Sequence, residues 1–323
     1  MKCRMCMLQS VCTRLILTAF ITMSACGRCD DAVTSVCADQ DASCRPIAGY
    51  LPGYTLFKPA HVATLPKKLK EASDVTVVAT SEVALIQDEK GIIFLYDLKE
   101  DDVVRKIKFG PKGDYEGMAE VNDTMYVLRS NGTLFKVPNW RENNDATHQT
   151  LNLPTKDNEG LCYDAFANQL LIAPKSRWKK KLGGGKRKRP LFAVDLKTEQ
   201  MKSEPAFVVT TKDILAFAKK KRLTVPGKIN KKGEFKDRLR FMPAAVAVHP
   251  VTGEIYIVSS VDRTLISINR QQKITGFTML DPQLFLQPEG IAFLPDGTLV
   301  VVNESPKKKP GLLLFKWNSG KTR

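Results

Sequence analysis

The sequence predicts an all-β fold, a β-propeller with five blades, and three observations support this. From about Tyr54 onward, short alternating apolar runs are separated by turn residues, which is the pattern of half-buried strands. One strand–turn–strand pattern recurs with starts at positions 71, 116, 159, 244 and 289, so neighbouring copies lie 45, 43, 85 and 45 residues apart. Repeats of about 40–45 residues that each contain several short strands are typical of propeller blades.

The recurring unit is clearest in its last copy, where residues 288–293 predict a strand, 295–297 a turn and 299–302 a second strand. The same order appears in three further copies, namely 243–248 with 255–258, 158–163 with 170–173, and 115–119 with 125–128, and a degenerate copy begins at Glu71. One blade cannot bury both faces of its own sheet, so neighbouring blades in a ring must cover them.

The 85-residue interval between the third and fourth copies holds either a sixth blade or an insertion, and we favour an insertion. Residues 211–222 (TKDILAFAKKKR) predict an amphipathic helix with Ile214, Leu215 and Phe217 facing the body and lysines at its end. Residues 225–236 are charged and contain no second alternating pair of strands. The prediction is a helical basic insertion between blades three and four, with a six-bladed ring left open.

Residues 1–25 have the features of a lipoprotein signal peptide. A positive region precedes an apolar stretch of about eleven residues, which is too short to span a bilayer as a helix. The stretch ends in Met23-Ser24-Ala25-Cys26, which resembles the lipobox of bacterial lipoproteins. We therefore expect lipidation at Cys26, a flexible spacer over residues 26–53, and the propeller over residues 54–323. This predicts a bacterial cell-envelope protein, lipid-anchored to a membrane (outer membrane or periplasm-facing); an ordinary cleaved signal is the alternative.

The formal net charge of +16 comes with 34 acidic residues, so it indicates basic patches on a globular protein and not a basic tail. Residues 175–189 form a basic, glycine-containing run that fails as a phosphate-binding Walker motif, because Gly185-Lys186 is followed by arginine. We expect this run to be a hairpin tip in blade three. With residues 219–222 and 307–309 it either contacts anionic lipid head groups or is a solvated loop. An exported protein rarely meets nucleic acid, so we do not expect that partner.

Three acidic residues, Glu116, Glu159 and Glu289, stand at the same point of three copies, just before the innermost strand. Equivalent positions in a ring converge on its central channel, where unpaired like charges are costly and a cation with oxygen ligands is the usual remedy. The sequence therefore predicts a divalent-cation site, with Ca²⁺ favoured, to which adjoining loops add the carboxylates of Asp88, Glu89, Asp114 and Glu304. The alternative is that each glutamate binds backbone amides and fixes a turn of its blade.

Two cationic residues, Arg129 and Lys175, end the second strands of blades two and three. They either neutralise the carboxylates or bind an anionic ligand such as a phosphate beside the metal. The chain contains no Gly-x-Ser-x-Gly nucleophile elbow and no His-Glu-x-x-His motif, so nucleophilic and zinc-peptidase catalysis find little support. We expect a ligand- or partner-binding propeller, and the sequence leaves open whether it is an enzyme.

Several segments between Tyr54 and Lys316 carry a family resemblance, namely residues 86–91 (IQDEKG), 113–117 (GDYEG), 126–132 (YVLRSNG) and 287–293 (QPEGIAF), with Asn303-Glu304. With these segments the chain resembles the SdiA-regulated proteins. They are a bacterial propeller group distantly similar to NHL-repeat and gluconolactonase-like propellers. The resemblance implies five blades, an association with calcium, and an unsettled link to phytase-like chemistry. A calcium-dependent phytase-like phosphoester hydrolase is accordingly the alternative function, and a lactonase is a third. Asp74 and Ala244 depart from the pattern, so any ring of carboxylates is incomplete.

Overall fold

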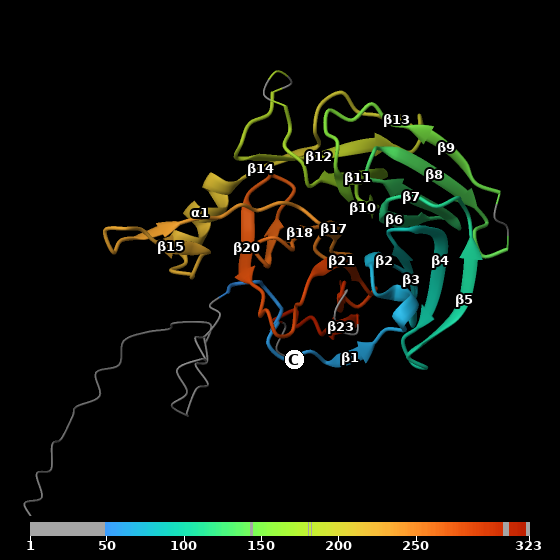
Figure 1. Cartoon of the computed structure of the whole chain (residues 1–323), viewed down its shortest axis with the longest axis horizontal. Coiled ribbons are helices and arrows are strands. Elements are labelled where there is room, and N and C mark those ends of the chain that lie inside the picture. Colours follow the sequence, from blue (N-terminus) through green and yellow to red (C-terminus); the bar gives the residue numbers. More distant parts are fainter. Residues whose placement is uncertain (1–48, 143–144, 180, 182, 306–309, 321–323) are drawn as a thin grey trace, which may run out of the picture. The chain divides into compact units, whose positions relative to one another are not determined.

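The computed structural model describes residues 49–142, 145–179, 181, 183–305 and 310–320. Within them five antiparallel sheets are arranged around a common centre (Figure 1). This confirms the predicted five-bladed β-propeller. The signal peptide, Cys26 and most of the spacer lie outside the described residues.

Each blade is one sheet, and in blades one to four the strands follow one another in sequence order from the centre outward. Blade one contains β2 (Ala72–Ala79), β3 (Glu82–Gln87), β4 (Lys90–Asp97) and β5 (Asp102–Lys108). Blade two contains β6 (Tyr115–Val121), β7 (Thr124–Arg129), β8 (Thr133–Pro138) and β9 (Thr147–Thr150). Blade three contains β10 (Asn158–Asp164), β11 (Gln169–Pro174), β12 (Lys188–Asp195) and β13 (Gln200–Met201), and β14 (Phe207–Thr210) also pairs with β12.

Blade four contains β17 (Ala245–Val248), β18 (Ile255–Ser259), β19 (Thr264–Ile268) and β20 (Ile274–Met279). Blade five contains β21 (Pro288–Phe293), β22 (Leu299–Asn303), β23 (Gly311–Phe315) and, as its outermost strand, β1 (His61–Thr64) from the other end of the chain. The pairing of Val62 with Leu313 in the register of β1 and β23 closes the ring. A short 3₁₀ helix, η1 (Lys67–Leu69), then leads from β1 into blade one.

The hydrophobic core consists of five buried clusters, one between each pair of neighbouring blades. Strand β3 shows why one blade serves two clusters. Its side chains alternate between faces, so Val83 and Leu85 pack toward blade five while Ala84 and Ile86 pack toward blade two. All four are fully buried. The cluster that joins blades one and five is the direct sign that the ring closes after the fifth sheet.

The insertion between blades three and four is partly as predicted. Helix α1 (Thr211–Lys220) is capped by Thr210, whose hydroxyl accepts a hydrogen bond from the Asp213 amide. The helix buries Ile214 and Ala218, with Phe217 half-buried. Residues 225–236 were expected to lack a strand pair, and this was wrong, because β15 (Gly227–Ile229) and β16 (Phe235–Asp237) form an isolated two-stranded hairpin. Of the helices that the structure describes, none has the length and apolar character needed to cross a membrane.

Candidate functional site

The recurring acidic position is a β-bulge. The register between the first two strands of a blade shifts at Ser73, Glu116, Glu159 and Glu289, so each of these residues has no partner in the neighbouring strand. A bulge bends the strand and redirects the side chain of the extra residue. Blade four shows no such shift, and there the equivalent Ala244 donates its amide to the Val258 carbonyl at 2.9 Å.

The glycine after each of the three glutamates allows the inner strands to approach one another closely. A Cβ on Gly117 would lie 2.7 Å from the Glu159 carbonyl oxygen, and one on Gly160 would lie 2.9 Å from the Val246 nitrogen. No Cβ fits at such distances from backbone atoms, which explains why Glu–Gly recurs as a pair. The glutamate supplies a redirected carboxylate, and the glycine lets the neighbouring inner strand come close enough to bring the carboxylates together.

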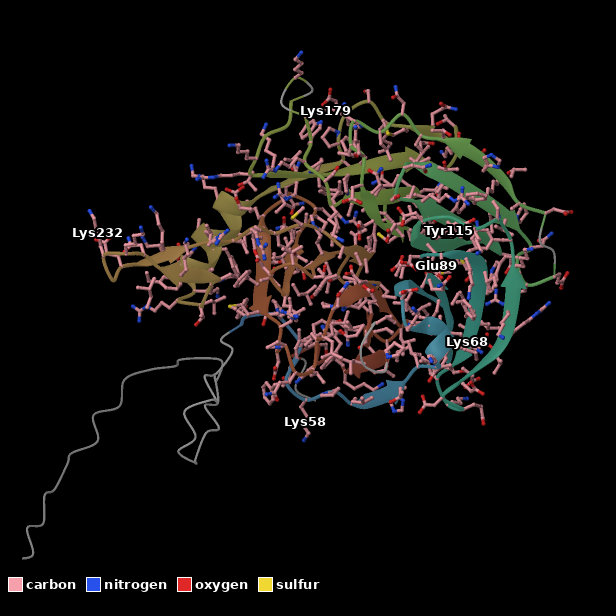
Figure 2. The ribbon with its side chains drawn as sticks, viewed as in Figure 1. Lys58, Lys68, Glu89, Tyr115, Lys179 and Lys232 are labelled. Carbon is pink, nitrogen blue, oxygen red and sulfur yellow. The ribbon has the colours of Figure 1, made fainter. Side chains whose placement is uncertain are left out.

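The start of the inner strands and the end of the second strands share one edge of the ring. We call the carboxylates at this edge the acidic rim, and it comprises Glu71, Asp88, Glu89, Asp114, Glu116, Asp157, Glu159, Glu289 and Glu304. Glu89, labelled in Figure 2, lies in the turn between β3 and β4 of blade one. The rim is a concentrated negative region on a protein whose net charge is +16.

Lys175 interacts electrostatically with several carboxylates of the acidic rim. Its ammonium pairs with Glu159 Oε1 at 3.0 Å, and the side chains of Glu159 and Lys175 are only 7% and 25% exposed. Burial lowers the pKa of Lys175, but the negative charges of Glu159 and Glu289 outweigh it and raise the pKa overall. Lys175 is therefore charged at neutral pH, and its charge also acts on Glu116 and Glu304.

On the blade-five side of the rim, Gln287 joins two acidic side chains. Its amide donates to Glu289 Oε1 at 3.0 Å and also hydrogen-bonds Glu304. Glu289 is buried, with a relative exposure of 7%, and its second carboxylate oxygen makes no hydrogen bond of standard geometry within the described residues, although the Ser260 side chain also interacts with this carboxyl group. Sequence reasoning did not single out Gln287, although it stands two residues before Glu289 in the motif that carries the resemblance.

The blade-one and blade-two parts of the rim are more open. Asp88 is half-buried and its Oδ1 has no partner in the described structure, whereas Glu89 and Asp114 are exposed. Asp114 accepts a hydrogen bond from the Ser130 hydroxyl. Glu71, which we had only used to mark a repeat, also has a buried oxygen without a described partner, while its other oxygen accepts from Lys70 at 2.9 Å.

Five carboxyl groups of the rim have raised pKa values, those of Asp88, Glu116, Glu159, Glu289 and Glu304. Burial is the largest cause, and repulsion between neighbouring carboxylates adds to it. Together they raise the pKa of Glu304 to about 7 and the pKa of Asp88 to about 6. Burial also raises the pKa values of Glu116, Glu159 and Glu289, and the ammonium of Lys175 opposes this in all three. Full ionisation of these carboxyls is therefore unfavourable without a further positive charge beside them, which is a physical reason to bind a further cation.

Arg129 lies against aromatic rings. Its guanidinium stacks over Tyr115 at 4.6 Å from the ring centroid and donates to the Tyr115 hydroxyl at 2.9 Å and the Lys112 carbonyl at 2.8 Å. Arg129 is the last residue of β7, whereas Lys175 follows the last residue of β11, so the two cations are one position out of register. Of these two predicted cations, only Lys175 pairs with a rim carboxylate in the contacts described.

The donor set suits a hard cation, but the positions do not form a finished metal site. Carboxylate oxygens are the preferred ligands of Ca²⁺, and the oxygens of Glu289, Asp88 and Glu71 that make no described hydrogen bond of standard geometry are available to one. Among the described residues, however, no group of three or more histidine, cysteine, aspartate or glutamate side chains is placed to hold a metal ion. Metal binding at the rim would require side chains to move, with Lys175 first among them.

No protein-family model matches this chain, and no curated protein sequence matches it. Among solved structures, Myxococcus xanthus glutaminyl cyclase is similar with a TM-score of 0.50 and 13% identity over 81% of this chain and 96% of that chain. Staphylococcus aureus virginiamycin B lyase is similar with a TM-score of 0.43 and 11% identity over 79% of this chain and 69% of that chain. At these identities the similarity shows the fold alone. None of these comparisons supports the more specific resemblance to SdiA-regulated proteins. The chain is a five-bladed β-propeller whose bulged glutamates gather at one edge of the ring.

Proposed function

We propose that this protein is a ligand- or partner-binding propeller whose acidic rim takes up a divalent cation, with Ca²⁺ favoured. The observation that supports this best is the excess of half-buried and buried carboxylates over cations at one edge of the ring, including the oxygen of Glu289 that makes no hydrogen bond of standard geometry among the described residues. A bound cation would relieve the repulsion that raises the pKa values of Glu304 and Asp88.

In this proposal Lys175 is an internal competitor for the cation. Its ammonium already sits at 3.0 Å from Glu159, so a metal ion that uses this carboxylate has to displace it. Removing the ammonium should therefore tighten Ca²⁺ binding, whereas removing the charge of Glu159 or Glu289 should weaken it. A site that formed elsewhere on the surface would respond to neither change.

The test is isothermal titration of Ca²⁺ into the chelator-treated full chain. We expect Glu289→Gln to weaken binding about tenfold or more, since one charged ligand is lost, and Lys175→Met to strengthen it. Glu204→Gln is the matched control, because Glu204 is exposed and lies outside the rim. Absence of heat at millimolar Ca²⁺, or equal effects of Glu204→Gln and Glu289→Gln, would refute the proposal.

The alternative of a phytase-like hydrolase needs cations that are free to hold substrate phosphate. Lys175 pairs with Glu159 and Arg129 with Tyr115 and Lys112, so no specific contact favours it. The hydrolase would nevertheless be favoured if the protein released phosphate from inositol hexakisphosphate and the Glu159→Gln variant did not.

We also infer that the propeller is held at a bacterial membrane facing the periplasm or at the outer membrane, by lipid on Cys26. This rests on the lipobox-like sequence at residues 23–26 and on the preceding apolar stretch. Replacing Cys26 by serine should move the protein from the membrane fraction to the soluble fraction of the producing cells. Unchanged fractionation would refute the lipid anchor.

A further inference from the structure

The hairpin formed by β15 and β16 has features that intramolecular stability does not explain. It is an isolated two-stranded sheet of three residues a side, and all six strand residues are exposed. Such a hairpin is at best marginally stable in water by itself. Figure 1 shows it projecting from the ring beyond α1, and Lys232, labelled in Figure 2, lies at its tip.

The two faces of this hairpin differ in chemistry. Ile229 pairs with Phe235, which puts both on one face, and they are 71% and 59% exposed. The ring of Phe235 covers Gly227 on the same face, since a Cβ there would lie 2.2 Å from the ring. On the opposite face Lys228 pairs with Lys236. Like charges directly across a strand pair are destabilising, and an anion beside them would relieve the repulsion.

The turn holds the two faces in a fixed orientation. Asn230 Oδ1 accepts hydrogen bonds from the amides of Lys232 at 2.8 Å and Glu234 at 3.0 Å. Gly233 has a φ of +78°, a conformation that glycine adopts without strain, and its amide donates to the Asn230 carbonyl. The turn therefore presents Lys231 and Lys232 at the end of the hairpin, next to the apolar pair.

The surrounding segment is strongly basic. Residues 219–238 contain nine basic and two acidic side chains, which gives a net charge of +7 out of +16 for the whole chain. Two copies of this chain, each with a net charge of +16, repel one another overall despite the acidic rim, which disfavours a second copy as the partner of this surface. An anionic bilayer offers what both faces require, head-group charge for the lysines and acyl chains for Ile229 and Phe235.

We propose that the hairpin of residues 227–237 is a membrane-contact element that binds the surface of a bilayer containing anionic phospholipid and inserts Ile229 and Phe235 at its interface. Lysines 228, 231, 232 and 236 would bind the head groups. This contact is separate from the lipid anchor and from the acidic rim, and it would orient the ring relative to the membrane.

The test compares the full chain carrying Cys26→Ser, so that no acyl chain contributes, in its binding to vesicles of phosphatidylcholine alone and of phosphatidylcholine with about one third phosphatidylglycerol. We expect tighter binding to the anionic vesicles, and we expect Lys228→Gln/Lys236→Gln to reduce it by about 30-fold. Lys99→Gln/Lys197→Gln is the matched control, because it removes the same charge from two exposed turns elsewhere. Equal losses in the two double variants would overturn the proposal.

A second measurement locates the contact. In Phe235→Trp, fluorescence of the introduced tryptophan should shift to the blue on anionic vesicles and be quenched by brominated acyl chains. A spectrum unchanged by vesicles would overturn the proposal even if the chain bound through its N-terminal segment. Retention on an anionic polysaccharide or an RNA without binding to vesicles would likewise overturn it and assign the hairpin to another polyanion.

Discussion

Replacing Lys175 with methionine removes the ammonium at the centre of the acidic rim while keeping most of the side-chain volume. The ion pair with Glu159 measures 3.0 Å, and the glutamate is 7% exposed while the lysine is 25% exposed. Exposed ion pairs contribute about 0–1 kcal/mol, and breaking a fully buried pair costs about 3–5 kcal/mol. For this intermediate burial we expect a loss of about 2 kcal/mol, which corresponds to roughly 4–8 °C in the melting temperature.

The pH dependence of this loss tests the reasoning. The ammonium stabilises the fold only where the carboxyls near it are ionised, and burial and repulsion raise the pKa of its partner Glu159 to about 8 and the pKa of Glu304 to about 7. At about pH 5 many of these carboxyls are protonated in the folded protein, so the loss should be small, and at about pH 8 it should be largest. Lys175 itself stays charged over this range, because its pKa is raised.

The assay is thermal unfolding followed by far-UV circular dichroism at the two pH values, with Lys197→Met as the control variant. Lys197 is an exposed turn residue, so its replacement should change the melting temperature little at either pH. Equal destabilisation by Lys175→Met at both pH values, or an effect no larger than that of Lys197→Met, would refute the electrostatic role that we assign to Lys175.

Three further predictions concern the ring and the rim. Gly160→Ala should destabilise by about 2 kcal/mol, because the new Cβ would lie 2.9 Å from the Val246 nitrogen, whereas Gly185→Ala, with no atom within 4 Å, should have little effect on urea unfolding. Arg270→Leu should cost about 3 kcal/mol, since it leaves the fully buried Asp164 without its two 2.7 Å hydrogen bonds, and adding Asp164→Asn should recover part of that loss. Finally, Asp88 and Glu304 have folded-state pKa values of about 6 and about 7, above their unfolded values, so the stability that they contribute is present below about pH 4 and is lost as pH rises through about 7. Stability without added metal should therefore fall over this range, and millimolar Ca²⁺ should reduce the fall. An identical fall with and without Ca²⁺ would contradict cation binding at the rim.

Part of the candidate site could be predicted from the sequence because it repeats. Glu116, Glu159 and Glu289 stand at one position of the repeat, and this position is a bulge at the start of an inner strand in each case. Their mutual repulsion follows from the geometry of a ring. The cation that neutralises them in the described structure could not be predicted with the same security, because Arg129 and Lys175 differ by a single register position. That difference directs one side chain to aromatic rings and the other to Glu159.

The sequence by itself predicted the recurring blade, the helical insertion and the Glu–Gly pairs, since all of these depend on local periodicity and on a repeat of about 40–45 residues, but it left five and six blades open. Only the tertiary structure decided how the ring closes, because the pairing of β1 with β23 joins residues about 250 positions apart and leaves no periodic trace. It also decided the β15–β16 hairpin, whose exposed strands lack the apolar alternation that burial imposes. Patterns that arise from burial can be recognised in a single sequence, whereas the partners of individual polar side chains are fixed only when the blades pack against one another.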